Sequence, residues 1–447
     1  MRIAAFLMSA SLVSAQPVNN LQALLDNRVT VGKAVGIVAG AVDQTGVHIY
    51  SAGRTAAGAQ KPDGDTLFEI GSITKVFTSL LLADMIERGE VKADDPVSKY
   101  LPDHAEVPSR DGKQITLLNL SMQNSGLPRL PNNMKPADPA NPYADYDGPR
   151  LLAFLASYKL SRDPGEKYEY SNLAVGLLGF ALAHHAGTTY EQLVRDRIFQ
   201  PLHMDSSTIT LSPAQRKRMA QGHDAALAPV ENWDLDALAG AGAIRSTAND
   251  MLKFLAANLG LTDTPLKAAM LRMRSLRAPT GMPNVEIAMA WHIQTQFPPD
   301  IFWHNGGTAG FRSFAGMDVA GRKAVIVLCN TAYDIDNIGL HTLNDEYSAP
   351  MIEAHQEIKI DPKILGDYEG SYQLAPSFAI KVSTRDGRLF VQATGQPEFE
   401  VFPSKKDEFF LKVVDAQITF TRDAGGKVTG MVLHQNGRDL PGPRAKS

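Results

Sequence analysis

Residues 68–89 read FEIGSITKVFTSLLLADMIERG, and this stretch places a serine at the start of a strongly apolar helical pattern. From Ser72 to about Arg88, apolar side chains recur at the three- and four-residue spacing of an α-helix, and Gly89 is suited to ending it. Positions three apart share one face of a helix. We therefore expect the hydroxyl of Ser72 and the ammonium of Lys75 to lie side by side.

This pair suits nucleophilic catalysis. A serine hydroxyl attacks a carbonyl once a base takes its proton, and a nearby positive charge favours the alkoxide. At about 4 Å and an effective dielectric of about 20, one charge contributes about 4 kcal/mol. The N–H groups at a helix start can also stabilise an oxyanion. The alternative is a chance Ser-x-x-Lys, which usually represents a helix cap followed by a solvated lysine.

A second candidate segment is Tyr170-Ser171-Asn172, which precedes a helical pattern over residues 172–185. A tyrosine phenol beside a lysine can act as a base. An asparagine at the same place can hydrogen-bond the amide of an acyl group. The alternative is structural, with Ser171 or Asn172 capping the helix and Tyr170 packing against its surroundings.

A third candidate segment, residues 304–311, reads HNGGTAGF. Its glycines lie between two apparent strands, 288–295 and 311–318, and glycine lets a backbone approach a ligand closely at a sheet edge. A free N–H there would complete an oxyanion hole, and His304 would contact the tail of a substrate. The alternative is an ordinary glycine-rich connection with a surface histidine.

Together, the order Ser-x-x-Lys, Tyr-x-Asn and basic residue-x-Gly resembles that of the penicillin-recognising serine hydrolases. The closest resemblance is to class C beta-lactamases, AmpH-type D,D-peptidases and family VIII carboxylesterases. The likeness extends to residues 94–102, 115–120 and 199–204 and covers about residues 20–350. It implies an α+β fold, in which an antiparallel sheet is flanked by helices beside a helical subdomain. The C-terminal part resembles the all-β, lipocalin-like domain of some members.

The resemblance also implies roles by position. Ser72 would be acylated, with Lys75 and Tyr170 sharing the role of base. The backbone N–H groups of Ser72 and Gly307 would form the oxyanion hole. The implied substrate-binding residues are, in chain order, Asn172, His304, Asn305, Gly306 and Gly307.

Two positions depart from the family pattern. His304-Asn305-Gly306 stands where most beta-lactamases and transpeptidases of this type carry Lys-Thr-Gly. A histidine is mostly neutral near pH 7 and lacks the permanent charge of a lysine. Leu130 stands near the place of a glutamine in class C beta-lactamases. Both changes favour an esterase or peptidase over an efficient beta-lactamase.

The length of 447 residues allows two domains after a leader. A basic residue, a short apolar run and small residues before Gln16 are typical of a secretory signal peptide, residues 1–15. A buried first helix is the alternative. Residues 16–355 have strands at both ends and helices between them, which predicts the catalytic domain. Short alternating strands over residues 362–447 predict a small β-barrel.

Composition excludes several functions. The net charge is −4 and no basic run occurs, which argues against a nucleic-acid partner. No later stretch has the length of a membrane span, so we expect a periplasmic or secreted protein after signal cleavage. No metal or cofactor motif is found. The single cysteine, Cys329, ends an apolar run and is expected to be buried.

The sequence therefore predicts a serine hydrolase that works through an acyl-enzyme on a small molecule or peptide. Candidate substrates are D-alanyl peptides, including the peptidoglycan stem peptide, small esters and, weakly, beta-lactams. The alternative is a non-catalytic penicillin-binding sensor that retains the pocket.

Overall fold

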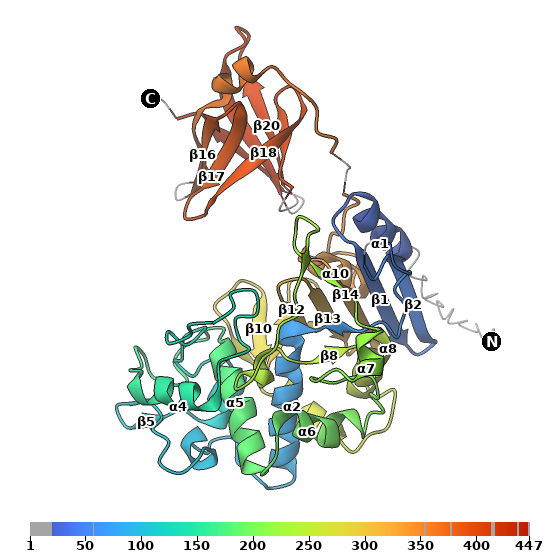
Figure 1. Ribbon diagram of the computed structural model, residues 1–447, viewed down its shortest axis with the longest axis vertical. Helices are drawn as coiled ribbons and strands as arrows, with labels where there is room; N and C mark the ends of the chain where they lie inside the picture. Colours follow the sequence, from blue (N-terminus) through green and yellow to red (C-terminus); the bar gives the residue numbers. More distant parts are fainter. Residues whose placement is uncertain are drawn as a thin grey trace, which may run out of the picture.

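The computed structural model describes residues 20–56, 58–352, 355–375, 378–412, 416–435 and 438–445. Figure 1 shows a larger body of helices around a sheet, followed along the chain by a smaller all-β body. The expected signal peptide, residues 1–15, lies outside the described residues.

Eight antiparallel strands form the sheet of the larger body, in the order β2-β1-β14-β13-β12-β11-β10-β9. Distant parts of the chain meet in it, because β1 (Gly36–Asp43) pairs with β14 (Lys323–Cys329), as Figure 1 shows. The other strands are β2 (Gly46–Gly53), β9 (Ala278–Pro279), β10 (Val285–Ala288), β11 (Trp291–Gln294), β12 (Ile301–Gly307) and β13 (Arg312–Asp318). The predicted sheet with meeting ends is confirmed.

Both faces of this sheet are covered. Alternate side chains of a strand point to opposite faces, and those of β14 enter two different cores. Val325 and Val327 pack in a core with α1 (Leu21–Thr30) and α10 (Asp336–Leu343), which also holds the buried Cys329. The intervening residues of β14 join the main core, which includes α2 (Thr74–Glu87) and α8 (Ala248–Asn258).

Helix α2 is enclosed, since every residue from Thr74 to Met85 is buried. A helix that is apolar on all sides is expected at the centre of a core. The other helices and helical turns of the larger body are α3 (Leu117–Ser121), α4 (Gly148–Ser157), α5 (Asn172–His185), α6 (Tyr190–Val194), α7 (Pro213–Arg216), α9 (Lys267–Ser275), η1 (Gly71–Ile73), η2 (Val97–Tyr100), η3 (Arg195–Phe199) and η4 (Ala239–Ala241). Three two-stranded ladders complete it, formed by β3 (Phe68–Glu69) with β8 (Arg245–Ser246), β4 (Ser109–Arg110) with β5 (Lys113–Gln114), and β6 (Gly222–His223) with β7 (Pro229–Val230).

The smaller body is a nearly closed eight-stranded antiparallel barrel. Its first and last strands approach each other through a bridge between Tyr372 and Arg444. Buried Tyr368, Phe409 and Phe420 lie in its own core. After the turn η5 (Pro362–Tyr368), the strands are β15 (Gly370–Ala375), β16 (Phe378–Arg385), β17 (Arg388–Ala393), β18 (Glu398–Lys405), β19 (Glu408–Phe410), β20 (Ala416–Arg422), β21 (Val428–Gln435) and β22 (Arg438–Pro443). The all-β prediction is confirmed.

Two local predictions are wrong. The strand expected over 288–295 is a hairpin, because Met289 and Ala290 have positive φ angles of 40° and 73° and separate β10 from β11. The glycine-rich segment is not a connection at a sheet edge. Its first four residues end β12, which lies inside the sheet because His292 of β11 pairs with Trp303.

Among the described residues, none of the helices combines the length and the apolar character that crossing a bilayer requires.

Candidate active site

Ser72 and Lys75 meet at the junction of η1 and α2. The Nζ atom of Lys75 lies 2.8 Å from Oγ of Ser72 and donates a second hydrogen bond of 2.7 Å to the carbonyl oxygen of Ala241. Lys75 is 0% exposed, which rules out the solvated lysine of the structural alternative. Burial, and secondly the charge of Arg129, hold the pKa of Lys75 well below its ordinary value. A neutral amine here can accept the serine proton.

Turn η4 and the residues after it bond to buried polar side chains of α2. Thr78, one turn after Lys75, donates a hydrogen bond of 2.7 Å to the carbonyl oxygen of Gly240. The Oγ1 of Thr74 accepts a hydrogen bond of 3.2 Å from the backbone N–H of Ile244. Lys75 is therefore one of several α2 side chains that bond to this turn or to the residues after it, and its Nζ atom has little freedom to move away from Ser72.

Tyr170 completes the group around the serine. Its phenol lies close to Ser72, whose side chain affects its pKa, and its ring centroid lies 4.9 Å from Nζ of Lys75. Burial raises the pKa of Tyr170 above its ordinary value, against the smaller effect of the neighbouring Ser72 side chain. The phenol is therefore protonated near pH 7. In the resting protein the better base is Lys75, and the phenol is a proton donor.

Ser171 orients this tyrosine by capping α5. Its Oγ accepts a hydrogen bond of 2.9 Å from the N–H of Ala174 and donates one of 2.6 Å to the carbonyl of Pro128. The capping alternative is thus correct for Ser171. It is compatible with the position of Tyr170 beside Ser72.

Asn172 is the first residue of α5 and points toward the same region. Its Nδ2 donates a hydrogen bond of 3.3 Å to the hydroxyl of Tyr143. Its Oδ1 is buried and has no hydrogen-bond partner within the described part of the chain. A buried acceptor without a partner is costly.

The end of β12 packs backbone to backbone against the segment before Ser72. A Cβ atom on Gly306 would lie 2.0 Å from the carbonyl oxygen of Ile70 and 2.4 Å from Oγ of Ser313. A Cβ atom on Gly71, whose φ is +49°, would lie 2.7 Å from the nitrogen of Gly307. Glycine is thus required on both sides of the contact, and the backbone of Gly307 is brought beside the nucleophile.

His304 and Asn305 face opposite sides of β12, as neighbouring strand residues do. His304 is 1% exposed, so it is not a surface histidine. Burial, His292 and Lys75 hold its pKa well below the ordinary value, which keeps it neutral. Asn305 instead donates a hydrogen bond of 2.5 Å to Asp336 of α10. The side chain of Asn305 is not brought to Ser72.

The sequence analysis missed three neighbours of these residues. His292 hydrogen-bonds to the hydroxyl of Tyr168 over 2.9 Å and lies 5.1 Å, ring to ring, from His304. Burial and the charge of Lys75 lower the pKa of His292 to about 4. Arg129 places its Cζ atom 5.1 Å from the ring centroid of Tyr170. Its only sequence signal was the adjacent Leu130, at a position already compared with a substrate contact in class C enzymes.

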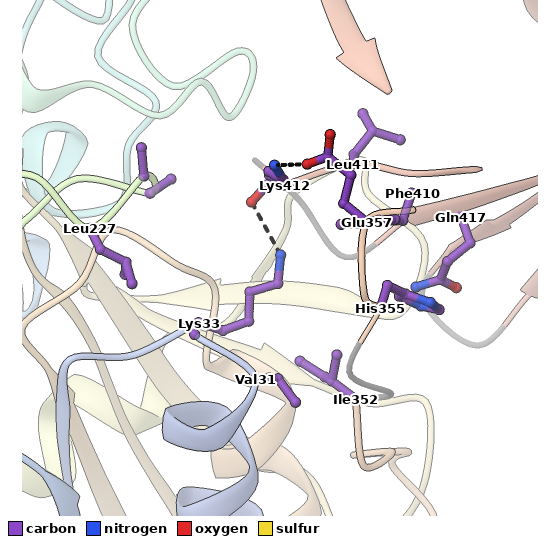
Figure 2. Close-up of a pocket in the computed structure, with 13 residues that line it drawn as sticks. Val31, Lys33, Leu227, Ile352, His355, Glu357, Phe410, Leu411, Lys412 and Gln417 are labelled. Atoms are coloured by element: carbon purple, nitrogen blue, oxygen red, sulfur yellow. Dashed lines mark hydrogen bonds and ion pairs between the residues drawn. The ribbon is translucent and has the colours of Figure 1, made fainter. Parts of the chain in front are cut away.

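A pocket of about 360 Å³ lies away from these residues, between the larger body and the barrel. Figure 2 shows Lys33 reaching toward Lys412, to whose carbonyl oxygen it donates a hydrogen bond of 3.1 Å. Lys412 in turn forms an ion pair of 2.8 Å with Glu357. None of the proposed catalytic side chains lines this pocket. Within the described ranges no cluster of His, Cys, Asp or Glu suited to a metal ion occurs.

Known protein families match both bodies of the chain. A family model described as Beta-lactamase matches residues 21–345, and one described as Domain of unknown function (DUF3471) matches residues 354–443. The chain is 34% identical over 262 residues to the D-alanyl-D-alanine-carboxypeptidase/endopeptidase AmpH of Escherichia coli (strain K12), which covers 56% of the chain and 67% of that relative. It is 26% identical over 421 residues to penicillin-binding protein 4* of Bacillus subtilis (strain 168), which covers 86% and 88%.

A solved structure supports the same likeness. The beta-lactamase/D-alanine carboxypeptidase of Yersinia pestis, in complex with citrate, superposes with a TM-score of 0.64 at 27% identity. The match covers 74% of this chain and 98% of that one. A class C beta-lactamase from Rhodobacter sphaeroides gives a TM-score of 0.62 at 25% identity, with 72% and 97% covered.

Proposed function

The chain belongs to the beta-lactamase family of serine hydrolases, and we propose that it hydrolyses acyl compounds through an ester formed on Ser72. The observation that carries this proposal is the contact of 2.8 Å between Ser72 and a fully buried Lys75. A neutral lysine at hydrogen-bond distance from a serine is the arrangement that general-base activation requires.

In the acylation step, Oγ of Ser72 attacks the substrate carbonyl as Lys75 accepts the hydroxyl proton. The negative charge that develops on the carbonyl oxygen is stabilised by the N–H groups of Ser72 and Gly307. Tyr170, a protonated phenol beside Ser72, donates a proton to the leaving group and is reprotonated from Lys75. In deacylation, water replaces Ser72 as the nucleophile, and the same base takes its proton.

Small esters and D-alanyl peptides are the proposed substrates, with beta-lactams as weak ones. The name of the Escherichia coli relative supports a peptide substrate. The neutral His304 argues against strong recognition of a carboxylate by β12, because the charge of the family lysine is missing there. The amino-terminal pattern supports a periplasmic or secreted location, where a peptidoglycan stem peptide would be accessible.

Intact-protein mass spectrometry tests the proposal. The protein is mixed with p-nitrophenyl esters, a D-alanyl-D-alanine peptide and a penicillin, and the mass is followed over time. We expect a transient acyl adduct that peptide mapping assigns to Ser72, and product release at the rate at which the adduct decays. S72A is expected to lose the adduct and to lower hydrolysis at least about 10³-fold.

The exposed Ser109 provides the matched control, since S109A removes a hydroxyl from a surface ladder. It should react as the unmodified chain does. An adduct on another residue, or hydrolysis that survives S72A, would overturn the proposed mechanism. A stable adduct with no turnover on any ester would instead support the sensor.

A further inference from the structure

Arg129 places a permanent positive charge beside the reacting groups. Its guanidinium carbon lies 5.1 Å from the ring centroid of Tyr170, and Nζ of Lys75 lies 4.9 Å from the same centroid. Arginine over an aromatic face is a favourable arrangement. The charge of Arg129 helps to lower the pKa of Lys75. The exposed side chain of Arg129 is therefore next to the catalytic group and open to solvent.

The backbone of Arg129 is anchored to the start of α5. Its carbonyl oxygen accepts hydrogen bonds of 3.0 Å from the N–H of Asn172 and 3.2 Å from that of Leu173. The preceding residue, Pro128, accepts the hydroxyl of Ser171 over 2.6 Å. The loop that carries Arg129 is thus attached to the helix that carries Asn172. This loop and the start of α5 therefore form one wall beside Tyr170.

No acidic side chain neutralises this arginine within the described residues. Glu169, which directly precedes the catalytic tyrosine, forms an ion pair of 2.5 Å with Arg162 instead. The groups whose titration responds to Arg129 are Lys75 and the phenols of Tyr143, Tyr168 and Tyr170. None of these is an anion near pH 7. A charge without a partner at this wall is suited to an anionic group on a bound molecule.

We propose that Arg129 determines specificity by binding a carboxylate on the acyl portion of the substrate. A guanidinium binds a carboxylate through two parallel hydrogen bonds. The site thereby recovers, on the loop after α3, a permanent charge that β12 lacks because His304 is neutral. The preferred substrates are acyl compounds with an acidic acyl chain. This inference rests on the proposed function.

The test compares two esters that differ in one charge. The p-nitrophenyl monoester of adipic acid carries a carboxylate at the far end of its acyl chain, and the p-nitrophenyl ester of adipamic acid carries a neutral amide there. We expect the full chain to prefer the anionic ester by about 10-fold or more in kcat/KM at low salt, and the preference to shrink as salt is added. In R129M the ratio of the two kcat/KM values should fall to about 1.

The ratio is the readout because any effect of Arg129 on Lys75 acts equally on both esters and cancels. R129K keeps the charge and should retain part of the preference. Lys159 is exposed and makes no contact with the proposed site within the described part of the chain, so K159M, which also removes a positive charge, should leave the ratio unchanged.

Three outcomes overturn the inference alone, and a fourth overturns the proposed function with it. A ratio near 1 in the unmodified chain overturns the inference, as does an equal loss on both esters in R129M, and in both cases the hydrolase stands. A salt-independent preference that persists in R129M overturns it as well. If the unmodified chain hydrolyses neither ester and Ser72 carries no adduct by mass, the proposed function fails and the inference falls with it.

Discussion

At the scale of single residues, the chemistry depends on the protonation state of Lys75. A buried ammonium is costly, and no carboxylate lies among the groups that shift its pKa. The neutral amine fits its surroundings better, because it still has N–H groups to donate to the carbonyl oxygen of Ala241 and to Oγ of Ser72. Arg129 adds to this effect, so the cation proposed to bind substrate also favours the neutral form of the base.

The pH dependence of kcat/KM should report this lysine. Only the neutral amine accepts the serine proton, so activity is present above the lowered pKa of Lys75 and is lost as the pH falls through it. The midpoint of this acid limb should lie well below the ordinary value of 10.5. The neutral ester is the substrate to use, because its own charge does not change. A midpoint at or above 10.5 would contradict the role of Lys75 as base.

Substitution of the same residue provides the second half of this test. K75R keeps a positive charge that stays protonated at any working pH, and we expect a loss of about 10² to 10⁴ in kcat/KM across the whole profile. K135R makes the same exchange at an exposed lysine and should leave the profile unchanged.

At the scale of elements, the site depends on how closely β12 approaches η1. Backbone atoms of the two segments are in contact because Gly71 and Gly306 have no side chains. Ser313 of β13 reinforces the junction by donating a hydrogen bond of 2.8 Å to the carbonyl oxygen of Ile70. This contact sets the distance between Ser72 and the N–H of Gly307, on which oxyanion stabilisation depends.

G306A should separate these two elements. The added methyl group would lie 2.0 Å from the carbonyl oxygen of Ile70, so the strand or the turn has to shift. A displacement of about 1 Å can lower kcat about 10²-fold, and overpacking costs about 1–3 kcal/mol of stability. Ester hydrolysis and thermal unfolding measure the two effects.

G366A is the matched control, because a Cβ atom on Gly366 meets nothing within 4 Å. It should leave both measurements near those of the unmodified chain. Full activity in G306A would show that the contact between β12 and η1 is not needed for catalysis.

At the scale of the whole molecule, the chain has separate hydrophobic cores. The two clusters of the larger body share no residue with the cluster of the barrel, which is centred on aromatic side chains such as Tyr372 and Phe420. Lys33 and Lys412 contribute a polar contact across the pocket in Figure 2. Bodies with their own cores and a polar junction are expected to unfold independently.

Calorimetry of the full chain should therefore show two unfolding transitions. Removing residues 353–447 should abolish one of them and leave the other within a few degrees. The shortened chain should hydrolyse small neutral esters within about 3-fold of the full chain, because the barrel supplies none of the proposed catalytic side chains. A single transition in the full chain, together with an inactive shortened chain, would contradict this division.

The sequence alone determined the parts of the structure that follow from local spacing. It predicted the apolar helix after Ser72, the helix over 172–185, the sheet made from both ends of the catalytic region and the all-β character of the C-terminal part. Each of these is visible in periodicity, which depends only on the geometry of helices and strands. The residue pattern did not indicate β12, because His304 to Gly307 includes two glycines, which carry no strand signal; a strand at His304 followed only from the family resemblance.

Only the tertiary structure decided what these elements do together. Burial of Lys75, the meeting of Tyr170 with Ser72, and the placement of Arg129 over Tyr170 all join segments distant in sequence. The hydrogen bond from Asn305 to Asp336 likewise depends on which face of β12 is covered by α10. Such contacts arise from long-range packing, which spacing along the chain does not encode. A pKa also depends on desolvation and neighbouring charges, so the chemistry of a side chain appears only once the chain is folded.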